Sequence, residues 1–369
     1  AELAAFLLSP ASRLVNGAGI RADGGLVLHY MDAAANLREY RKREAEHSWS
    51  GDGDGSFADT TAAIFGKPDH RTVGGSRLMP LAGRNILVTG SGKGIGSDIV
   101  KTAASMGARV VVHYNSSEES ALRVRDEILA SGAPCALIKE DLSADGGAAR
   151  LYEKATDAFA EMASQAVAAG PASSPEEAGS AAGFGDAGGI PPHAGIDILV
   201  NNAALQMNFT FDRYNAALLK RILKVNLKGY TMLSRLALPY MCSSGWGRII
   251  NISSVHSKRP TTFDPGYCMT KGGIRMLTRE LALEMTAYPD ITVNAVEPGA
   301  VEIGAKSGNP PSTVPDAQLR LPRLFPYRKL ANGLLDPSEI SSAVMFLASD
   351  AAGRINGSCL RVDDGAMLK

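Results

Sequence analysis

The chain has 369 residues, and its 38 Lys and Arg side chains balance 38 Asp and Glu side chains, so its formal net charge is zero. A protein without net charge has no overall field to attract nucleic acid or an anionic membrane, which disfavours both as partners. Hydrophobic residues make up 45% of the chain, as in an ordinary globular protein. The length predicts one large domain with additional material.

The four cysteines lie far apart, and the six histidines include no pair at the i, i+4 spacing of a helical metal site. This distribution predicts reduced thiols and no bound metal. No apolar run approaches the ~20 residues of a membrane span, and the first residues lack the basic flank of a signal peptide. We therefore expect a cytoplasmic protein, although a targeting segment could be missing because the chain begins on Ala.

Two segments at opposite ends of the chain are similar to each other. Residues 5–28 and 345–368 align without a gap and share ten of 24 residues. Each pattern indicates a helix end, an Asn-Gly turn and a short strand that leads into Asp-x-Gly. We interpret residues 1–28 as the C-terminal part of an upstream unit of the same fold, the alternative being two generic helix–turn–strand pieces. Residues 29–80 combine a charged helical stretch with Gly/Asp/Ser-rich sequence and are predicted to be a linker.

The first elements after the linker form a strand–turn–helix–strand pattern. Two apolar runs, 86–88 and 109–112, suit buried parallel strands. Between them lie Thr-Gly-Ser-Gly-Lys-Gly-Ile-Gly at 89–96 and a predicted helix over 98–106. Glycines at such a turn let the backbone approach a pyrophosphate, and the N–H groups at the start of the helix can bind it. The pattern predicts a dinucleotide-binding site.

The residues after the second strand bear on the choice between NADP and NAD. An NAD site usually has a carboxylate here for the ribose hydroxyl group, whereas this chain has Tyr114, Asn115 and Ser116, with no acid before Glu118. Lys93, inside the glycine-rich turn, is a cation that can meet a 2′-phosphate. These features favour NADP, and NAD remains an alternative because no arginine follows the strand.

The spacing T-G-x-x-x-G-x-G resembles that of the short-chain dehydrogenase/reductase family. The resemblance implies an α/β, doubly wound parallel-sheet Rossmann domain over residues 81–369. It also implies cofactor contacts from the glycine-rich turn, the ends of the third and fourth strands and a later Pro-Gly turn, namely Gly90, Gly94, Ile95, Gly96, Asp141, Leu142, Asn202, Ala203, Pro298 and Gly299. Ala204 departs from the family's N-N-A-G sequence, and Ile303 lies where a threonine is usual.

A stretch between the third strand (135–139) and the fourth strand (196–200) has a different composition. Residues 163–194 are rich in Ala, Gly, Pro and Ser and have no periodicity. They are predicted to be a flexible surface insertion, with a lid as the alternative. By resemblance, residues 305–330 correspond to the family's variable substrate-covering region.

Tyr267 and Lys271 lie four residues apart at the start of a predicted helix over 272–285, and Ser254 lies thirteen residues before Tyr267. Residues four apart share one face of a helix. A free tyrosine has a pKa of ~10 and is a poor base at pH 7. An adjacent lysine cation, helped by an oxidised nicotinamide, is expected to favour the phenolate. The pattern predicts that Tyr267 donates or accepts the proton.

The resemblance adds roles for the neighbouring residues. Ser254 would hold the substrate oxygen, Lys271 would also bind the nicotinamide ribose, and Asn226 would complete a proton relay. The alternative for Asn226 is an amide satisfied by the backbone. By the same resemblance, the helices around Asn226 and after Lys271 would form the seam of a homodimer or homotetramer.

The sequences around Ser254 and Lys271 are similar to those of glucose 1-dehydrogenase-like and 3-oxoacyl-[acyl-carrier-protein] reductase-like members. We therefore expect an NADP(H)-dependent oxidoreductase that interconverts a secondary alcohol and a ketone on a sugar, a polyol or a similar small molecule. The alternatives are a 3-oxoacyl-thioester reductase and a non-catalytic NADP-binding scaffold or sensor. A metal-dependent dehydrogenase is disfavoured because the sequence has no ligand cluster.

Overall fold

The computed structural model describes residues 80–169, 193–209, 211–261, 263–303 and 334–367. All of these residues belong to one compact unit. The predicted upstream fragment (1–28), the linker apart from Pro80, and the predicted substrate-covering region lie outside the described residues. Among the described helices, none combines the length and apolar composition needed to cross a membrane.

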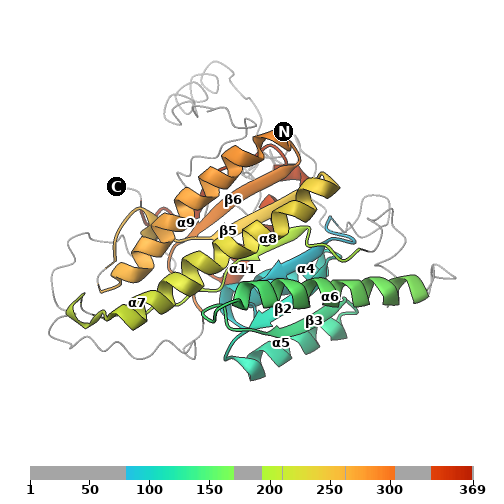
Figure 1. Cartoon of the computed structure of the whole chain (residues 1–369), viewed down its shortest axis with the longest axis horizontal. Coiled ribbons are helices and arrows are strands. Elements are labelled where there is room, and N and C mark those ends of the chain that lie inside the picture. The colour runs from blue at the N-terminus through green and yellow to red at the C-terminus, as the bar shows by residue number, and fades with distance from the viewer. Residues whose placement is uncertain (1–79, 170–192, 210, 262, 304–333, 368–369) are drawn as a thin grey trace, which may run out of the picture. The chain divides into compact units, whose positions relative to one another are not determined.

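The described strands form one parallel sheet in the order β3-β2-β1-β4-β5-β6-β7 (Figure 1). The chain runs outward from β1 to β3, crosses back to β4 and continues to β7, which is the predicted doubly wound arrangement. The seven strands are β1 (Asn85–Val88), β2 (Arg109–Tyr114), β3 (Cys135–Lys139), β4 (Ile198–Asn201), β5 (Gly247–Ile252), β6 (Ile291–Pro298) and β7 (Cys359–Val362).

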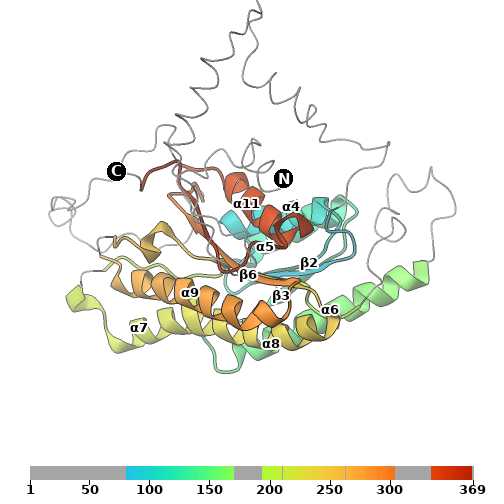
Figure 2. The ribbon, with the colours of Figure 1, turned by 90° about the horizontal axis from the view of Figure 1, so that it is seen from above.

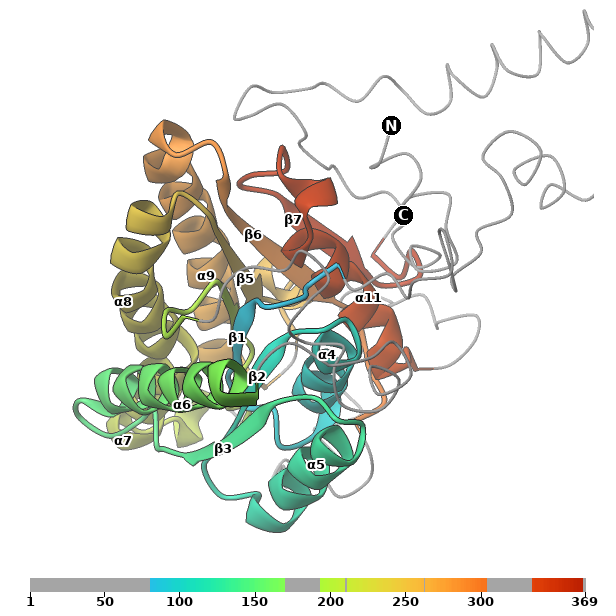
Figure 3. The ribbon, with the colours of Figure 1, turned by 90° about the vertical axis from the view of Figure 1, so that its right-hand side faces the viewer.

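Helices cover both faces of the sheet (Figures 2 and 3). Alternate strand residues point to opposite faces, so Ile86 and Val88 join one apolar cluster while Leu87 joins the other. The first cluster lies under α4 (Gly94–Ser105), α5 (Glu118–Ala130) and α11 (Pro337–Ala348), and the second lies under α6 (Gly147–Ala169), α8 (Gly229–Ser244) and α9 (Pro265–Glu284). Because both faces are covered, the strands are apolar throughout, as the sequence runs predicted.

Two helices begin earlier than predicted. α4 begins at Gly94, inside the glycine-rich turn, and α9 begins at Pro265 rather than at residue 272. Proline is favoured in the first turn because its missing N–H group would have no partner in the helix there. Tyr267 and Lys271 therefore lie within α9, four residues apart on one helical face, as their spacing predicted.

The predicted insertion is shorter than its sequence composition suggested. Residues 163–169 belong to α6, because an alanine-rich stretch is a good helix former. At the other end, the carbonyl oxygen of His193 accepts from Asn85 Nδ2 at 2.7 Å, and its Nδ1 lies 2.8 Å from the Tyr240 hydroxyl. The prediction that flexibility begins at residue 163 was therefore wrong, and residues 170–192 lie outside the described residues.

The C-terminal copy of the repeated segment has the predicted elements. α11 ends at Ala348, a turn follows at Asn356 and Gly357, and β7 leads into Asp363. Asn356 accepts from Val293 N–H and donates to the carbonyl oxygen of Ala282, both at 2.9 Å. The carboxylate of Asp363 accepts from two backbone N–H groups of the turn after β7. In the described copy, the shared residues Asn356 and Asp363 thus stabilise the turns before and after β7.

Candidate active site

The glycine-rich turn lies directly against the end of β4, where the strand order reverses. Gly90 has φ of +65°, and a Cβ atom there would lie 2.9 Å from the Cα of Ala203. A Cβ at Gly96 would lie 2.5 Å from Nδ2 of Asn202. The turn therefore needs glycine at both positions, and α4 begins inside it at Gly94 with free N–H groups. This cradle fits the pyrophosphate of a dinucleotide.

Asn202 and Ala203 support the turn through hydrogen bonds to its backbone and to Thr89. Thr89 Oγ1 accepts from the N–H groups of Asn202 at 2.9 Å and of Ala203 at 3.0 Å. Asn202 Nδ2 donates to the carbonyl oxygens of Thr89 at 2.9 Å and of Gly90 at 3.1 Å. The structure thus brings both predicted residues to the turn and adds Thr89, which the motif contained but to which no role was predicted.

His113 is a second residue that supports the glycine-rich turn and that sequence reasoning missed. It lies in β2, almost fully buried, and its Nδ1 accepts from Gly90 N–H at 2.9 Å. Its Nε2 lies 3.1 Å from the carbonyl oxygen of Glu140, which can only accept. These partners assign a neutral ring with the hydrogen on Nε2, and burial lowers the pKa of His113 to about 4. A histidine inside an apolar strand was the available signal.

The end of β2 presents the residues expected to select the cofactor. A Cβ at Gly92 would lie 3.4 Å from the Cβ of Tyr114, so the turn that carries Lys93 packs on this strand end. Lys93, Asn115 and Ser116 are exposed. Glu118, the first acid after the strand, pairs with Lys139 at 3.1 Å. A second cation that sequence reasoning missed therefore lies beside Tyr114, with its Nζ 5.8 Å from the ring centroid.

The other predicted cofactor residues lie around the same strand ends. Asp141 Oδ1 accepts from the N–H and hydroxyl groups of Ser143, and Leu142 is buried. Gly299, after Pro298 at the end of β6, donates its N–H to Val362 at 2.8 Å. Ile95 is partly buried against the first apolar cluster. The side chain of Ile303 lies 3.2 Å from the position of a Cβ at Gly94, so the residue that replaces the usual threonine faces the glycine-rich turn.

The structure brings Ser254, Tyr267 and Lys271 together at the end of β5. The Tyr267 hydroxyl group forms a hydrogen bond with Ser254, whose Oγ also accepts from His256 N–H at 3.2 Å. Lys271 is buried, and its Nζ donates to the carbonyl oxygen of Ile252 at 2.6 Å. The same Nζ lies 5.3 Å from the centroid of the Tyr267 ring.

The charge states of these groups differ from the expectation that a lysine cation favours a phenolate. Burial lowers the pKa of Lys271 to about 7. Burial also raises the pKa of Tyr267 to about 12, against a smaller lowering by the hydrogen bond from Ser254. Desolvation penalises the charged form of both groups.

Asn226 lies in a single π-helical turn, Lys224–Lys228, between α7 (Ala216–Leu223) and α8. Such turns are frequent at functional sites. The fully buried Asn226 amide accepts from Leu205 N–H at 2.7 Å and donates to the Leu205 carbonyl oxygen at 2.8 Å. It also donates to Thr270 Oγ1 at 3.2 Å, next to Lys271 in α9. The hydrogen bonds of Asn226 to Leu205 thus match the alternative of an amide satisfied by the backbone. Its contact with Thr270 also places it beside α9.

Two further ionisable residues surround Tyr267 and were not predicted. The His256 ring makes an edge contact with the Tyr267 ring, with 6.4 Å between centroids. Asp264, three residues before Tyr267, is fully buried. Both belong to the loop between β5 and α9, where residue type alone gives no signal. Within the described ranges, no group of three or more His, Cys, Asp or Glu side chains could hold a metal ion.

Comparisons with known proteins agree with this geometry. A family model described as short chain dehydrogenase matches residues 84–178, and one described as Enoyl-(Acyl carrier protein) reductase matches residues 191–367. The chain is 30% identical to 3beta-hydroxysteroid dehydrogenase 1 of Eggerthella lenta over 78% of this chain and 95% of that protein. It is 26% identical to glucose 1-dehydrogenase 2 of Bacillus subtilis over 78% of this chain and 96% of that protein. Landomycin C-6 ketoreductase LanV, solved with NADP and rabelomycin, has a TM-score of 0.61 at 25% identity, over 79% of this chain and 98% of its own.

Proposed function

The chain belongs to the short-chain dehydrogenase/reductase family and is an NAD(P)-dependent oxidoreductase, and we propose that it interconverts a secondary alcohol and a ketone with NADP(H). The observation that carries this proposal is the convergence of Ser254, Tyr267 and Lys271 at the end of β5. This end of the sheet also carries the dinucleotide cradle.

Ser254, Tyr267, Lys271 and Asn226 have separate roles in the proton step. Ser254 holds the substrate oxygen, and the Tyr267 hydroxyl, already hydrogen-bonded to Ser254, gives or takes the proton at that oxygen. Lys271 binds the nicotinamide ribose, and its ammonium form favours the phenolate of Tyr267. Asn226 connects the site to the segment after β4 through Leu205. A bound nicotinamide supplies or accepts the hydride.

Charge at the end of β2 supports NADP over NAD. Lys93 is an exposed cation in the turn that packs on the end of β2, and Lys139 lies beside the Tyr114 ring. Glu118 is already paired with Lys139, so it is poorly placed to repel a 2′-phosphate. Asn115 and Ser116 are exposed and can donate hydrogen bonds to that phosphate. LanV, a similar structure, is described with bound NADP.

The substrate is a small alcohol or ketone. A sugar or polyol follows from the similarity to glucose 1-dehydrogenase 2. The similarity to a 3-oxoacyl-[acyl-carrier-protein] reductase of Aquifex aeolicus favours a 3-oxoacyl thioester as the alternative. A panel that contains both classes separates them.

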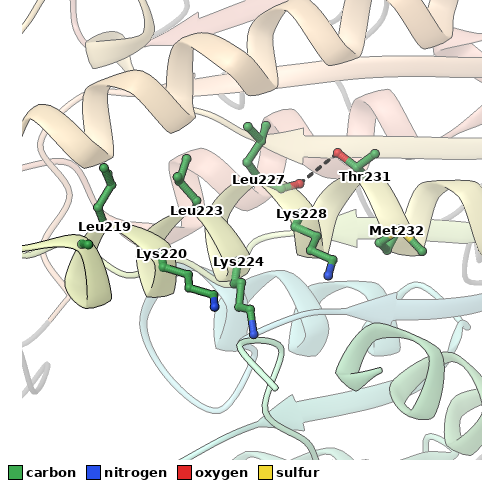
Figure 4. A pocket seen from close by; sticks show the side chains of 9 residues that line it. Leu219, Lys220, Leu223, Lys224, Leu227, Lys228, Thr231 and Met232 are labelled. Atoms are coloured by element: carbon green, nitrogen blue, oxygen red, sulfur yellow. Dashed lines mark hydrogen bonds between the residues drawn. The ribbon is translucent and has the colours of Figure 1, made fainter. Parts of the chain in front are cut away.

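A homodimer or homotetramer is supported by the outward faces of α7, α8 and α9. On α9, Met269, Met276 and Leu283 follow one another at intervals of seven residues and are 54%, 61% and 66% exposed. Residues seven apart in a helix share a face. A hollow on the neighbouring helices is lined by a leucine row and a lysine row, comprising Leu219, Leu223, Leu227, Lys220, Lys224 and Lys228 (Figure 4). Light scattering that finds only the monomer mass would contradict this assembly.

A cytoplasmic location is supported by the cysteines. Cys135, Cys242, Cys268 and Cys359 are all free thiols, and proteins of oxidising compartments usually pair theirs. A fluorescent fusion of the full-length protein that is secreted or enclosed in an organelle would contradict the location.

The proposed activity is tested by following NADPH and NADH oxidation in parallel against sugars, polyol-derived ketones and 3-oxoacyl thioesters. We expect turnover with at least one ketone, faster with NADPH, and a strongly reduced rate with Tyr267→Phe. NADPH binding without turnover across the whole panel would instead support the non-catalytic scaffold or sensor.

A further inference from the structure

Asp264 is a fully buried acid that the proposed reaction does not use. It lies at the N-terminal boundary of α9, three residues before Tyr267. The residue before it, Phe263, has φ of 66°, which is rare and unfavourable for a bulky side chain. The carbonyl oxygen of Phe263 accepts from Phe209 N–H at 2.8 Å. Strain of this kind clusters at functional sites.

The hydroxyl group of Tyr214 lies between two oxygen atoms that normally accept. Its oxygen is 2.7 Å from the carbonyl oxygen of Met207 and 3.1 Å from Oδ1 of Asp264. A tyrosine hydroxyl has one hydrogen, so it cannot donate to both. If Asp264 carries a proton, it donates to Tyr214, which then donates to Met207. The geometry therefore fits a carboxylic acid better than a carboxylate.

The described surroundings of Asp264 compensate a negative charge only in part. Its Oδ2 is buried with no hydrogen-bond partner among the described residues. The ionisable groups that face the carboxyl are Tyr214, Tyr267 and Cys268, and none of them becomes a cation. Gln206 and the Tyr267 N–H group favour the carboxylate only in part, because burial raises the pKa of Asp264 to about 6. The carboxyl group of Asp264 thus ionises close to neutral pH, and none of the described groups that shift its pKa is a cation.

The carboxyl group of Asp264 affects the surroundings of Tyr267 in two ways. Through Tyr214 it fastens the start of α9 to Met207, two residues from Leu205, which Asn226 holds. When ionised, Asp264 places a negative charge near Tyr267, and this charge raises the pKa of the Tyr267 hydroxyl. Its protonation state therefore bears on how readily Tyr267 releases its proton.

We propose that Asp264 is a positioning residue for the proton step. In its acid form it docks the first turn of α9 against Tyr214 and Met207, and in its ionised form its charge opposes the phenolate of Tyr267. This inference rests on the proposed role of Tyr267. It adds a residue that tunes that role without touching the reacting atoms.

The test is an absorbance titration of Tyr267 at 295 nm, taken as the difference between protein with and without Tyr267→Phe, with NADP⁺ saturating. The titration needs no substrate, so it stands even if the panel assay finds no turnover. Asp264→Asn keeps a donor for Tyr214 but never carries a charge. We expect it to lower the titration midpoint of Tyr267 by about one pH unit, because removing a nearby negative charge removes its opposition to the phenolate.

Two matched variants separate charge from packing. Tyr214→Phe removes the hydrogen-bonded contacts and keeps the carboxylate, so the midpoint of Tyr267 should stay near the wild-type value. Asp212→Asn removes an exposed acid of the same segment and should also leave it unchanged. If Asp264→Asn does not fold, Asp264→Ser is equally uncharged and should shift the midpoint in the same direction. An unchanged midpoint in the uncharged variant, or an equal shift with Tyr214→Phe, overturns the proposal.

Discussion

The two halves of the site differ in how their polar groups are satisfied. Around the glycine-rich turn, Thr89, Asn202 and His113 pair with backbone groups at ordinary hydrogen-bond distances. Around the catalytic helix, Tyr267 and Lys271 are ionisable groups whose burial shifts their pKa values against their charged forms. The cofactor half is thus preorganised for binding. In the catalytic half, Tyr267 and Lys271 take up their charged forms only beside a charged partner.

The largest expected effect is on turnover, and it tests this division between the two halves. Tyr267→Phe removes the group that transfers the proton and should lower turnover by about 10²- to 10⁴-fold. Because the hydroxyl group is not part of the cradle, the Kd for NADPH should stay within about twofold. Steady-state kinetics and fluorescence titration measure the two quantities. A comparable loss of NADPH affinity would break the proposed separation between the halves.

The buried lysine predicts a dependence of stability on pH. An unfolded lysine keeps its proton up to a pKa of about 10.4, whereas burial lowers the pKa of Lys271 to about 7. Between these values the unfolded state binds more protons, so the free energy of unfolding rises with pH. From pH 7 to pH 9 this contributes about 2 kcal/mol.

Urea unfolding of the cofactor-free protein and of Lys271→Met at both pH values isolates that contribution. The wild type should gain stability relative to the variant as the pH rises. Parallel behaviour of the two proteins would mean that Lys271 keeps an ordinary pKa. The catalytic half would then differ less from the cofactor half than the burial of Lys271 suggests.

In the cofactor half, substitution should change affinity and leave turnover intact. His113→Leu leaves the buried N–H of Gly90 and carbonyl of Glu140 unpaired, which costs about 1–3 kcal/mol. Some of this loss should appear as a roughly tenfold higher Kd for NADPH, with unchanged turnover at saturating cofactor. His113→Asn, which retains an acceptor for Gly90, should recover part of the affinity. A lower turnover number with an unchanged Kd would contradict a role in the turn.

The smallest effect concerns cofactor choice. Lys93→Ala should weaken NADPH binding a few-fold and leave NADH binding unchanged, because only the former has a 2′-phosphate. Added salt should reduce the difference, since the cation is exposed. Lys101→Ala serves as the control, because this exposed lysine of α4 pairs with Glu127. Equal losses for both cofactors would assign Lys93 to the pyrophosphate instead.

Much of the fold could be predicted because its signals are local. Buried parallel strands are continuous apolar runs, and the spacing from Ser254 to Tyr267 and Lys271 places all three at one strand end. The partners of His113 and Asp264 could not be predicted, because they lie 23 and 50 residues away in sequence. The shifted pKa values also escaped prediction, because desolvation depends on what the whole fold packs around a side chain.

The π-helical turn at Lys224–Lys228 makes this part of the chain sensitive to length. It holds one residue more per turn than an α-helix, so a one-residue deletion would let an uninterrupted α-helix form. Because the wide turn absorbs the extra residue, that α-helix would keep nearly the same orientation of α7 relative to α8. Ile222, which lies 3.3 Å from the position of a Cβ at Gly266, would keep its contact with the first turn of α9, whereas Asn226, inside the turn, would change its facing. Homologous chains that lack the extra residue should therefore keep the packing of α7 and lose the hydrogen bonds of Asn226.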